Sequence, residues 1–105
     1  MSIKYKRNEL IDFFKREPVT ISGEADGDWL YIYERNEFKL ILSLSTYCEN
    51  IDIAICYNEK IVYDKSFEHI REIYRLNIYE VQIVGELQNI TLNKFPQISA
   101  IIENK

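Results

Sequence analysis

Short runs of alternating apolar and polar residues fill most of the chain after its first quarter. β-branched and aromatic residues dominate these runs, and a period of two is typical of a strand with one buried face. The clearest run covers 51–57, where Ile51, Ile53 and Ile55 alternate with polar or small residues. Short polar turns separate consecutive runs, which predicts antiparallel hairpins. We expect strands at 19–22, 29–34, 38–45, 51–57, 61–66, 78–87, 90–95 and 98–103.

One segment near the N-terminus has helical spacing instead. Leu10, Phe13 and Phe14 fall at i, i+3 and i+4, so they share one face of a helix. Asn8 is a favourable N-cap, and Pro18 disfavours helical conformation at the residue before it. We therefore expect a helix of about three turns over 8–17 that covers the sheet with its aromatic face.

The segment 67–77 is ambiguous. Its apolar residues recur with the spacing of a helix: Phe67, Ile70, Ile73 and Tyr74. A short second helix and an irregular crossover both stay open here. The predicted fold class is α+β and mostly antiparallel β, with seven or eight short strands in a sheet or sandwich and an N-terminal helix. The 105 residues make a single domain, because a second core would not fit.

Charge and composition narrow the function classes. The net charge of −4 argues against nucleic-acid binding, which needs clustered Lys and Arg, and favours a basic protein partner. No apolar run approaches the ~20 residues of a membrane span, and no secretory signal follows the basic N-terminus. We expect a cytoplasmic protein with no membrane partner, in which Cys48 and Cys56 are reduced and pack as small hydrophobic residues. The oligomeric state stays open.

Few residues offer catalytic or metal-binding chemistry. His69 is the only histidine and has no Cys or His at ligand spacing, which favours a surface or structural role. The acidic loop with Glu24, Asp26 and Asp28 does not match the ligand spacing of a calcium loop. We expect no catalytic residue, no metal and no cofactor. An enzyme of carboxylate type stays open, provided that the fold brings two acids together in a cleft.

The predicted strand at 29–34 is apolar on both faces. Trp29, Tyr31 and Tyr33 share one face, opposite Leu30 and Ile32. Such a strand is typical of the middle of a sandwich or of a sheet covered by a helix. It is also typical of a partner-binding face, because Tyr and Trp are enriched among the residues that contribute most to binding.

The order of these features resembles a known family. A Gly-x-x-x-Gly-Asp-Trp-Leu-Tyr sequence at 23–31 follows the helix, and the strand that starts Phe-Lys-Leu-Ile-Leu-Ser leads to Tyr47 and the strand 51–57. Over 8–103, this arrangement resembles small immunity proteins of bacterial contact-dependent inhibition and related polymorphic-toxin systems. The resemblance implies a cytoplasmic antitoxin that binds the C-terminal toxin domain of a large secreted protein, often a nuclease, and occludes its active site.

The expected function is therefore a non-enzymatic inhibitor of a toxin domain. Acidic residues would steer the encounter with a basic partner, and aromatic residues would anchor it. The candidate residues are Glu24, Asp26, Asp28 and Glu49 for charge, and Tyr31, Tyr33 and Tyr47 as anchors. The alternative is a small-ligand-binding domain with an aromatic-lined cavity near Trp29, against which a filled core would count.

Overall fold

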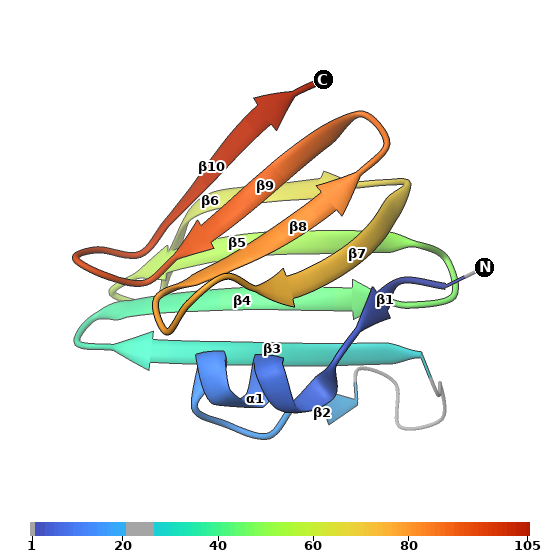
Figure 1. Ribbon diagram of the computed structural model, residues 1–105. Coiled ribbons are helices and arrows are strands. Elements are labelled where there is room, and N and C mark those ends of the chain that lie inside the picture. Colours follow the sequence, from blue (N-terminus) through green and yellow to red (C-terminus); the bar gives the residue numbers. More distant parts are fainter. Residues whose placement is uncertain (1, 21–26) are drawn as a thin grey trace.

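The computed structural model describes residues 2–20 and 27–105, which form two five-stranded sheets and one helix (Figure 1). The elements are β1 (Lys4–Tyr5), α1 (Arg7–Phe14), β2 (Val19–Thr20), β3 (Asp28–Arg35), β4 (Phe38–Ser45), β5 (Asn50–Tyr57), β6 (Lys60–Phe67), β7 (Ile70–Arg75), β8 (Glu80–Gly85), β9 (Gln88–Asn93) and β10 (Ser99–Asn104). The expected α+β, mostly antiparallel β fold class is confirmed. No helix in the described ranges is long and apolar enough to cross a membrane.

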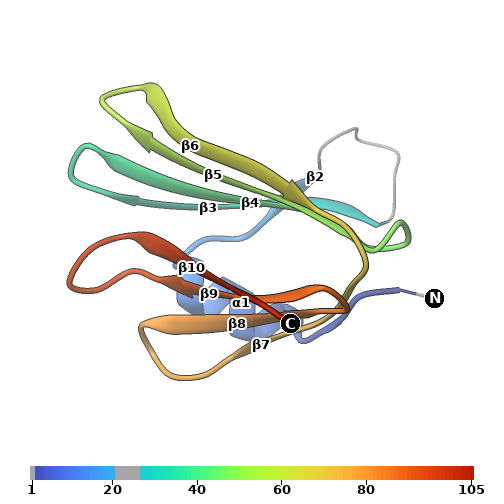
Figure 2. The same cartoon turned by 90° about the horizontal axis from the view of Figure 1, so that it is seen from above.

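The two sheets pack face to face as a sandwich (Figure 2). One sheet has the order β2-β3-β4-β5-β6 and is called the β3–β6 sheet; the other has the order β1-β7-β8-β9-β10 and is called the β7–β10 sheet. Consecutive strands pair as antiparallel hairpins within each sheet, and only the short pairing of β1 with β7 is parallel among the described strands.

The core follows from the alternation in the sequence. Tyr31, Leu42 and Ile53 are paired across β3, β4 and β5, and all three side chains are buried. Ile83 and Ile90 are paired across β8 and β9 and face them from the other sheet. A register shift by one residue would turn these side chains outward, so burial fixes the pairing.

Helix α1 closes one edge of the sandwich, because it contacts both β3 and β7. Phe13 and Phe14 are fully buried, as expected from their spacing. The helix boundaries differ from the expected ones. The N-cap is Lys6 rather than Asn8, and the helix ends at Phe14 because Lys15 adopts a left-handed conformation with φ of 60°.

The segment 67–77 forms strand rather than the expected helix or crossover. β6 ends at Phe67, and β7 begins at Ile70 after a tight turn. The register of β7 against β8 shifts between Ile70 and Glu72. Such a bulge adds one residue, so Ile70 and Ile73 both point into the core although they are three positions apart. The helical spacing is therefore produced by a bulged strand.

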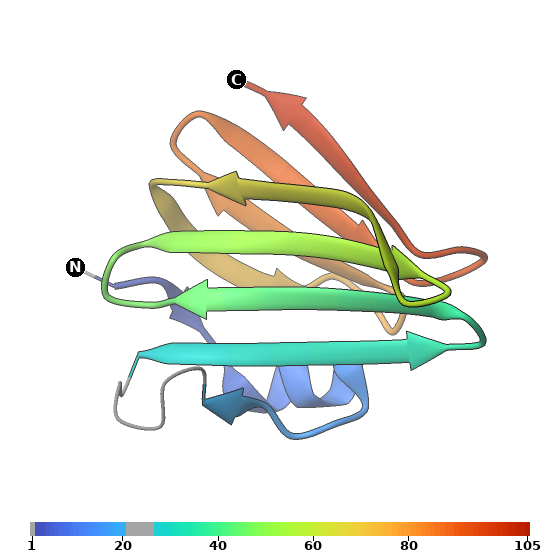
Figure 3. The same ribbon diagram turned by 180° about the vertical axis from the view of Figure 1, so that it is seen from behind.

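Strand β3, which is apolar on both faces, is covered on its inner face only. The inner face of β3 places Tyr31 in the core against Phe14, with ring centroids 5.4 Å apart. On the outer face, Leu30 and Ile32 are half-buried, and no described element lies over them (Figure 3). The β3–β6 sheet thus leaves one broad face open.

Candidate functional site

The expected partner-binding residues are dispersed over the molecule. Glu24 and Asp26 lie outside the described residues, and Asp28 is the half-buried first residue of β3. Tyr47 is 68% exposed in the turn between β4 and β5. Its ring lies over Gly27, where an added Cβ would come within 2.5 Å of Tyr47 Cδ2. Glycine is therefore required for this packing.

Glu49 lies near the same end of the sandwich but is already paired. Arg71 Nη1 donates to Glu49 Oε2 at 2.6 Å, and Arg71 Nη2 donates to Glu86 Oε1. His69 Nδ1 is 3.9 Å from Glu86 Oε2. His69 is exposed at the turn before β7, with φ of 59°, rather than on the helical surface that its sequence neighbours indicate. These groups form a surface ion-pair cluster.

Of the two aromatic anchors expected on β3, Tyr31 is a core residue. It is 1% exposed, so its ring is not available to a partner in this structure. Burial raises the pKa of Tyr31 well above its ordinary value of 10.0, and the adjacent Tyr5 adds to this effect. Tyr33 is half-buried, with its ring 5.0 Å from Lys94 Nζ.

Lys94 is the buried charged residue of the described ranges. Its Nζ donates to the carbonyl oxygen of Phe13 at 2.6 Å, near the C-terminal end of α1, where unpaired carbonyls attract a cation. The ring of Phe13 lies 4.7 Å from the same ammonium. Burial lowers the pKa of Lys94, and the nearby charges of Lys15 and Arg75 lower it further.

The end of the sandwich opposite to Tyr47 and Glu49 carries two exposed aromatic pairs. Each sheet contributes one pair, at the left end in Figure 1, and we call this surface the aromatic end. The rings of Phe38 and Tyr57 lie 4.8 Å apart, and those of Tyr79 and Phe95 stack at 5.0 Å. The exposed fractions are 39% and 42% for the first pair, and 42% and 52% for the second.

Arg35 ties the loop after β9 to the β3–β6 sheet. Its Nη1 donates to Lys94 O at 2.9 Å and its Nη2 to Pro96 O at 3.3 Å, while the guanidinium lies 5.5 Å from the Phe95 ring. The amide of Lys94 also donates to Tyr79 O at 3.0 Å. Phe95 and Tyr79 are therefore exposed but held in place.

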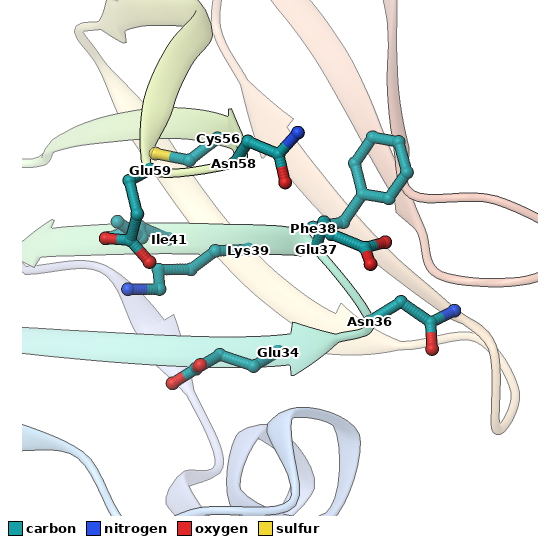
Figure 4. A pocket seen from close by; sticks show the side chains of 9 residues that line it. All are labelled: Glu34, Asn36, Glu37, Phe38, Lys39, Ile41, Cys56, Asn58 and Glu59. Carbon is teal, nitrogen blue, oxygen red and sulfur yellow. The ribbon is translucent and has the colours of Figure 1, made fainter.

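A hollow of about 420 Å³ adjoins the aromatic end on the outer face of the β3–β6 sheet (Figure 4). We call it the acidic hollow, because three carboxylates and a single ammonium line it: Glu34, Glu37, Glu59 and Lys39. The amide of Asn58 donates to Glu37 O at 3.0 Å, which joins the β5–β6 turn to the β3–β4 turn. The remaining lining residues are Asn36, Phe38, Ile41, Cys56 and Asn58.

A second hollow, of about 90 Å³, connects the two sheets at the aromatic end. It lies between the β3–β4 turn and the loop after β9. Asn36 and Phe38 line both hollows, so the two hollows adjoin. Phe38 belongs to the first aromatic pair, and Arg35, which lines the second hollow, contacts the Phe95 ring of the second pair. The other residues of the second hollow are Arg35, Pro96, Gln97 and Ile98.

This surface suits binding better than acid–base catalysis. Glu34, Glu37 and Glu59 are all exposed, whereas a catalytic carboxylic acid depends on burial to retain its proton at neutral pH. Within the described residues, no three His, Cys, Asp or Glu side chains are grouped so as to hold a metal ion. Both cysteines are free thiols; Cys48 is exposed rather than packed, and Cys56 is half-buried.

The aromatic end was not identified from the sequence. Its four aromatic residues lie next to turns, in segments that are far apart along the chain. The signal that was present is local: each of Phe38 and Tyr57 is adjacent to a polar turn, where the second sheet no longer covers a strand. Only the arrangement of the turns in space brings the two pairs together.

Comparisons with known proteins give one structural match. No protein-family model and no curated protein matches the chain. The chain is similar in structure to a chain of a "contact-dependent growth inhibition toxin - immunity protein complex" from Klebsiella pneumoniae 342. The match has a TM-score of 0.78 at 22% sequence identity and covers 100% of both chains. It shows that the two chains share a fold over their whole length.

Proposed function

We propose that the chain is an immunity protein that binds and neutralises a cognate toxin domain and catalyses no reaction itself. The observation that carries this proposal is the fold shared, over the full length of both chains, with a component of a toxin–immunity complex. The surface chemistry supports the inhibitor role within such a pair. Exposed aromatic residues beside carboxylates are typical of a protein-binding surface.

The toxin is proposed to be a nuclease, carried as the C-terminal domain of a large secreted protein and met in the cytoplasm. A nuclease binds phosphates through Lys and Arg, so its substrate site is basic. A protein with net charge −4 is attracted to such a site and, once bound, excludes nucleic acid from it. Occlusion of the active site is thus the proposed mechanism.

The proposal expects a large secreted protein to be encoded immediately upstream of this chain, and the test uses the C-terminal domain of that protein. Expression of that domain alone should arrest bacterial growth, and co-expression of this chain should restore it. An unrelated acidic β-sandwich of similar size, expressed to the same level, is the control and should not restore growth. Growth arrest that persists in the presence of this chain would contradict the proposal.

A small-ligand-binding function has less support. The space between the sheets is filled by buried aliphatic and aromatic side chains, and Trp29 packs against this core with the Arg7 guanidinium 5.2 Å from its ring. The acidic hollow is lined by exposed and half-buried residues only, so it opens on the surface. Drug-sized ligands usually bind in enclosed, mostly apolar pockets.

A further inference from the structure

We propose that the aromatic end and the acidic hollow together receive the partner, and that the segment bound there is a basic loop of the toxin domain that presents Arg or Lys. This inference rests on the proposed function and adds the place and the chemistry of the contact.

The first argument is the concentration of exposed apolar surface at one end of the molecule. Besides the two aromatic pairs, Ile61 is 64% exposed beside the acidic hollow, as the cross-strand partner of Cys56. Ile78 is 60% exposed in the turn next to Tyr79. Large apolar side chains gathered on one surface and bordered by polar groups mark an interaction site.

The second argument is that these side chains are held in position before binding. The Phe95 loop is fixed by the two carbonyl hydrogen bonds of Arg35, and the turns that border the acidic hollow are joined by the Asn58 amide. Asn58 and Glu59 both have positive φ, of 52° and 67°, as in a tight two-residue hairpin turn. Rigid aromatic anchors lose little entropy on binding.

The third argument is charge. In the acidic hollow, Lys39 lies between Glu34 and Glu59 (Figure 4), and the carboxylates outnumber the ammonium by three to one. Glu34 also pairs with Arg16 at 3.1 Å, whereas Glu37 and Glu59 make no ion pair with any described residue. In Figure 4, Glu59 and Glu37 lie at opposite sides of the hollow, so two cations of one basic loop could each gain a carboxylate partner, one at each side.

The same charge argument disfavours a second copy of this chain as the occupant. A symmetric dimer through this surface would bring the acidic hollows of the two chains into the same interface, and like charges in an interface are repulsive. A basic loop from a different protein meets both requirements, because its cations enter the hollow while its apolar residues contact the aromatic pairs.

The experiment measures binding of the toxin domain to four variants by surface plasmon resonance at several salt concentrations. Glu37→Lys with Glu59→Lys tests charge, and Phe38→Ala with Phe95→Ala tests the aromatic anchors. The matched controls lie away from this surface: Glu68→Lys with Glu72→Lys, and Val19→Ala with Leu87→Ala. Thermal unfolding and circular dichroism confirm that each variant keeps the fold.

The charge variant should slow association at least tenfold at low salt and weaken its salt dependence. The aromatic variant should speed dissociation at least tenfold. Both controls should stay within threefold of the wild type. Should the charge variant bind like the wild type while the controls weaken binding, the inference is overturned and the proposed function stands.

Two further outcomes overturn the inference. If the wild-type chain does not bind the toxin domain, the proposed function is contradicted, and the inference that rests on it is contradicted as well. A concentration-dependent dimer in analytical ultracentrifugation that Phe38→Ala with Phe95→Ala dissociates would assign the aromatic end to self-association.

Discussion

At the residue scale, Lys94 joins the end of α1 to the interior of the sandwich. Lys94→Met keeps most of the side-chain volume but leaves the Phe13 carbonyl without its donor. We expect the free energy of unfolding to fall by about 1–3 kcal/mol, measured by urea unfolding. Lys60→Met, at an exposed position, is the control and should stay within about 0.5 kcal/mol of the wild type. Equal stability of the wild type and Lys94→Met would contradict this role.

Lys94 also predicts a pH dependence of stability. Because its pKa is lowered in the folded state, the unfolded chain binds more protons over the pH range just below the ordinary value of 10.5. The free energy of unfolding should therefore gain a contribution from Lys94 as pH rises through that range. The difference in stability between the wild type and Lys94→Met, measured at pH 7 and pH 9.5, should shift in favour of the wild type at the higher pH. A constant difference would be inconsistent with a lowered pKa.

Tyr31 provides the second prediction at this scale. Its buried hydroxyl makes no hydrogen bond of good geometry with a described residue, so Tyr31→Phe should leave stability unchanged or raise it by up to about 1 kcal/mol. Tyr31→Ala should lower it by about 3–5 kcal/mol through the cavity it creates. The raised pKa keeps the folded phenol protonated, so stability falls above pH 10 as the unfolded phenol ionises, and Tyr31→Phe should reduce that fall. Chemical denaturation at several pH values measures the stability and its pH dependence. A large loss of stability in Tyr31→Phe at neutral pH would contradict the prediction.

At the element scale, the turn between β5 and β6 is the clearest case of local strain. Glu59 has φ of 67°, a conformation that costs a residue with a Cβ about 1 kcal/mol and costs glycine nothing. Glu59→Gly should raise the free energy of unfolding by about 0.5–1 kcal/mol in urea unfolding, although it removes a carboxylate from the acidic hollow. Lys60→Gly, at the first residue of β6, should instead lower the free energy of unfolding by a similar amount. A loss of stability in Glu59→Gly would contradict the turn assignment.

The strands were predictable where the alternation is regular. The boundaries of β4 agree with the expected 38–45, and those of β5 differ by one residue at one end. The prediction failed at β7, because a bulge imitates helical spacing, and it missed β1, because two residues carry too little pattern. The early end of α1 depends on the left-handed conformation of Lys15, which no residue type at that position indicates.

At the scale of the whole molecule, packing of the two sheets buries the core and brings together the residues of the candidate site. The sequence alone identified an apolar β3 but left open which side would be covered; Tyr31, named as a candidate anchor, lies in the core. The aromatic end depends on four turns that are distant in sequence and meet only after both sheets pack. Site prediction therefore required the fold, whereas fold-class prediction did not.

The measurement that tests the central claim most directly is a calorimetric titration of the purified toxin domain with this chain, combined with an assay of toxin activity on nucleic acid in the same samples. The account predicts a one-to-one complex with a Kd of about 1 nM or below and a loss of toxin activity in proportion to the complex formed. Absence of binding, or a complex in which the toxin domain remains fully active, would contradict it.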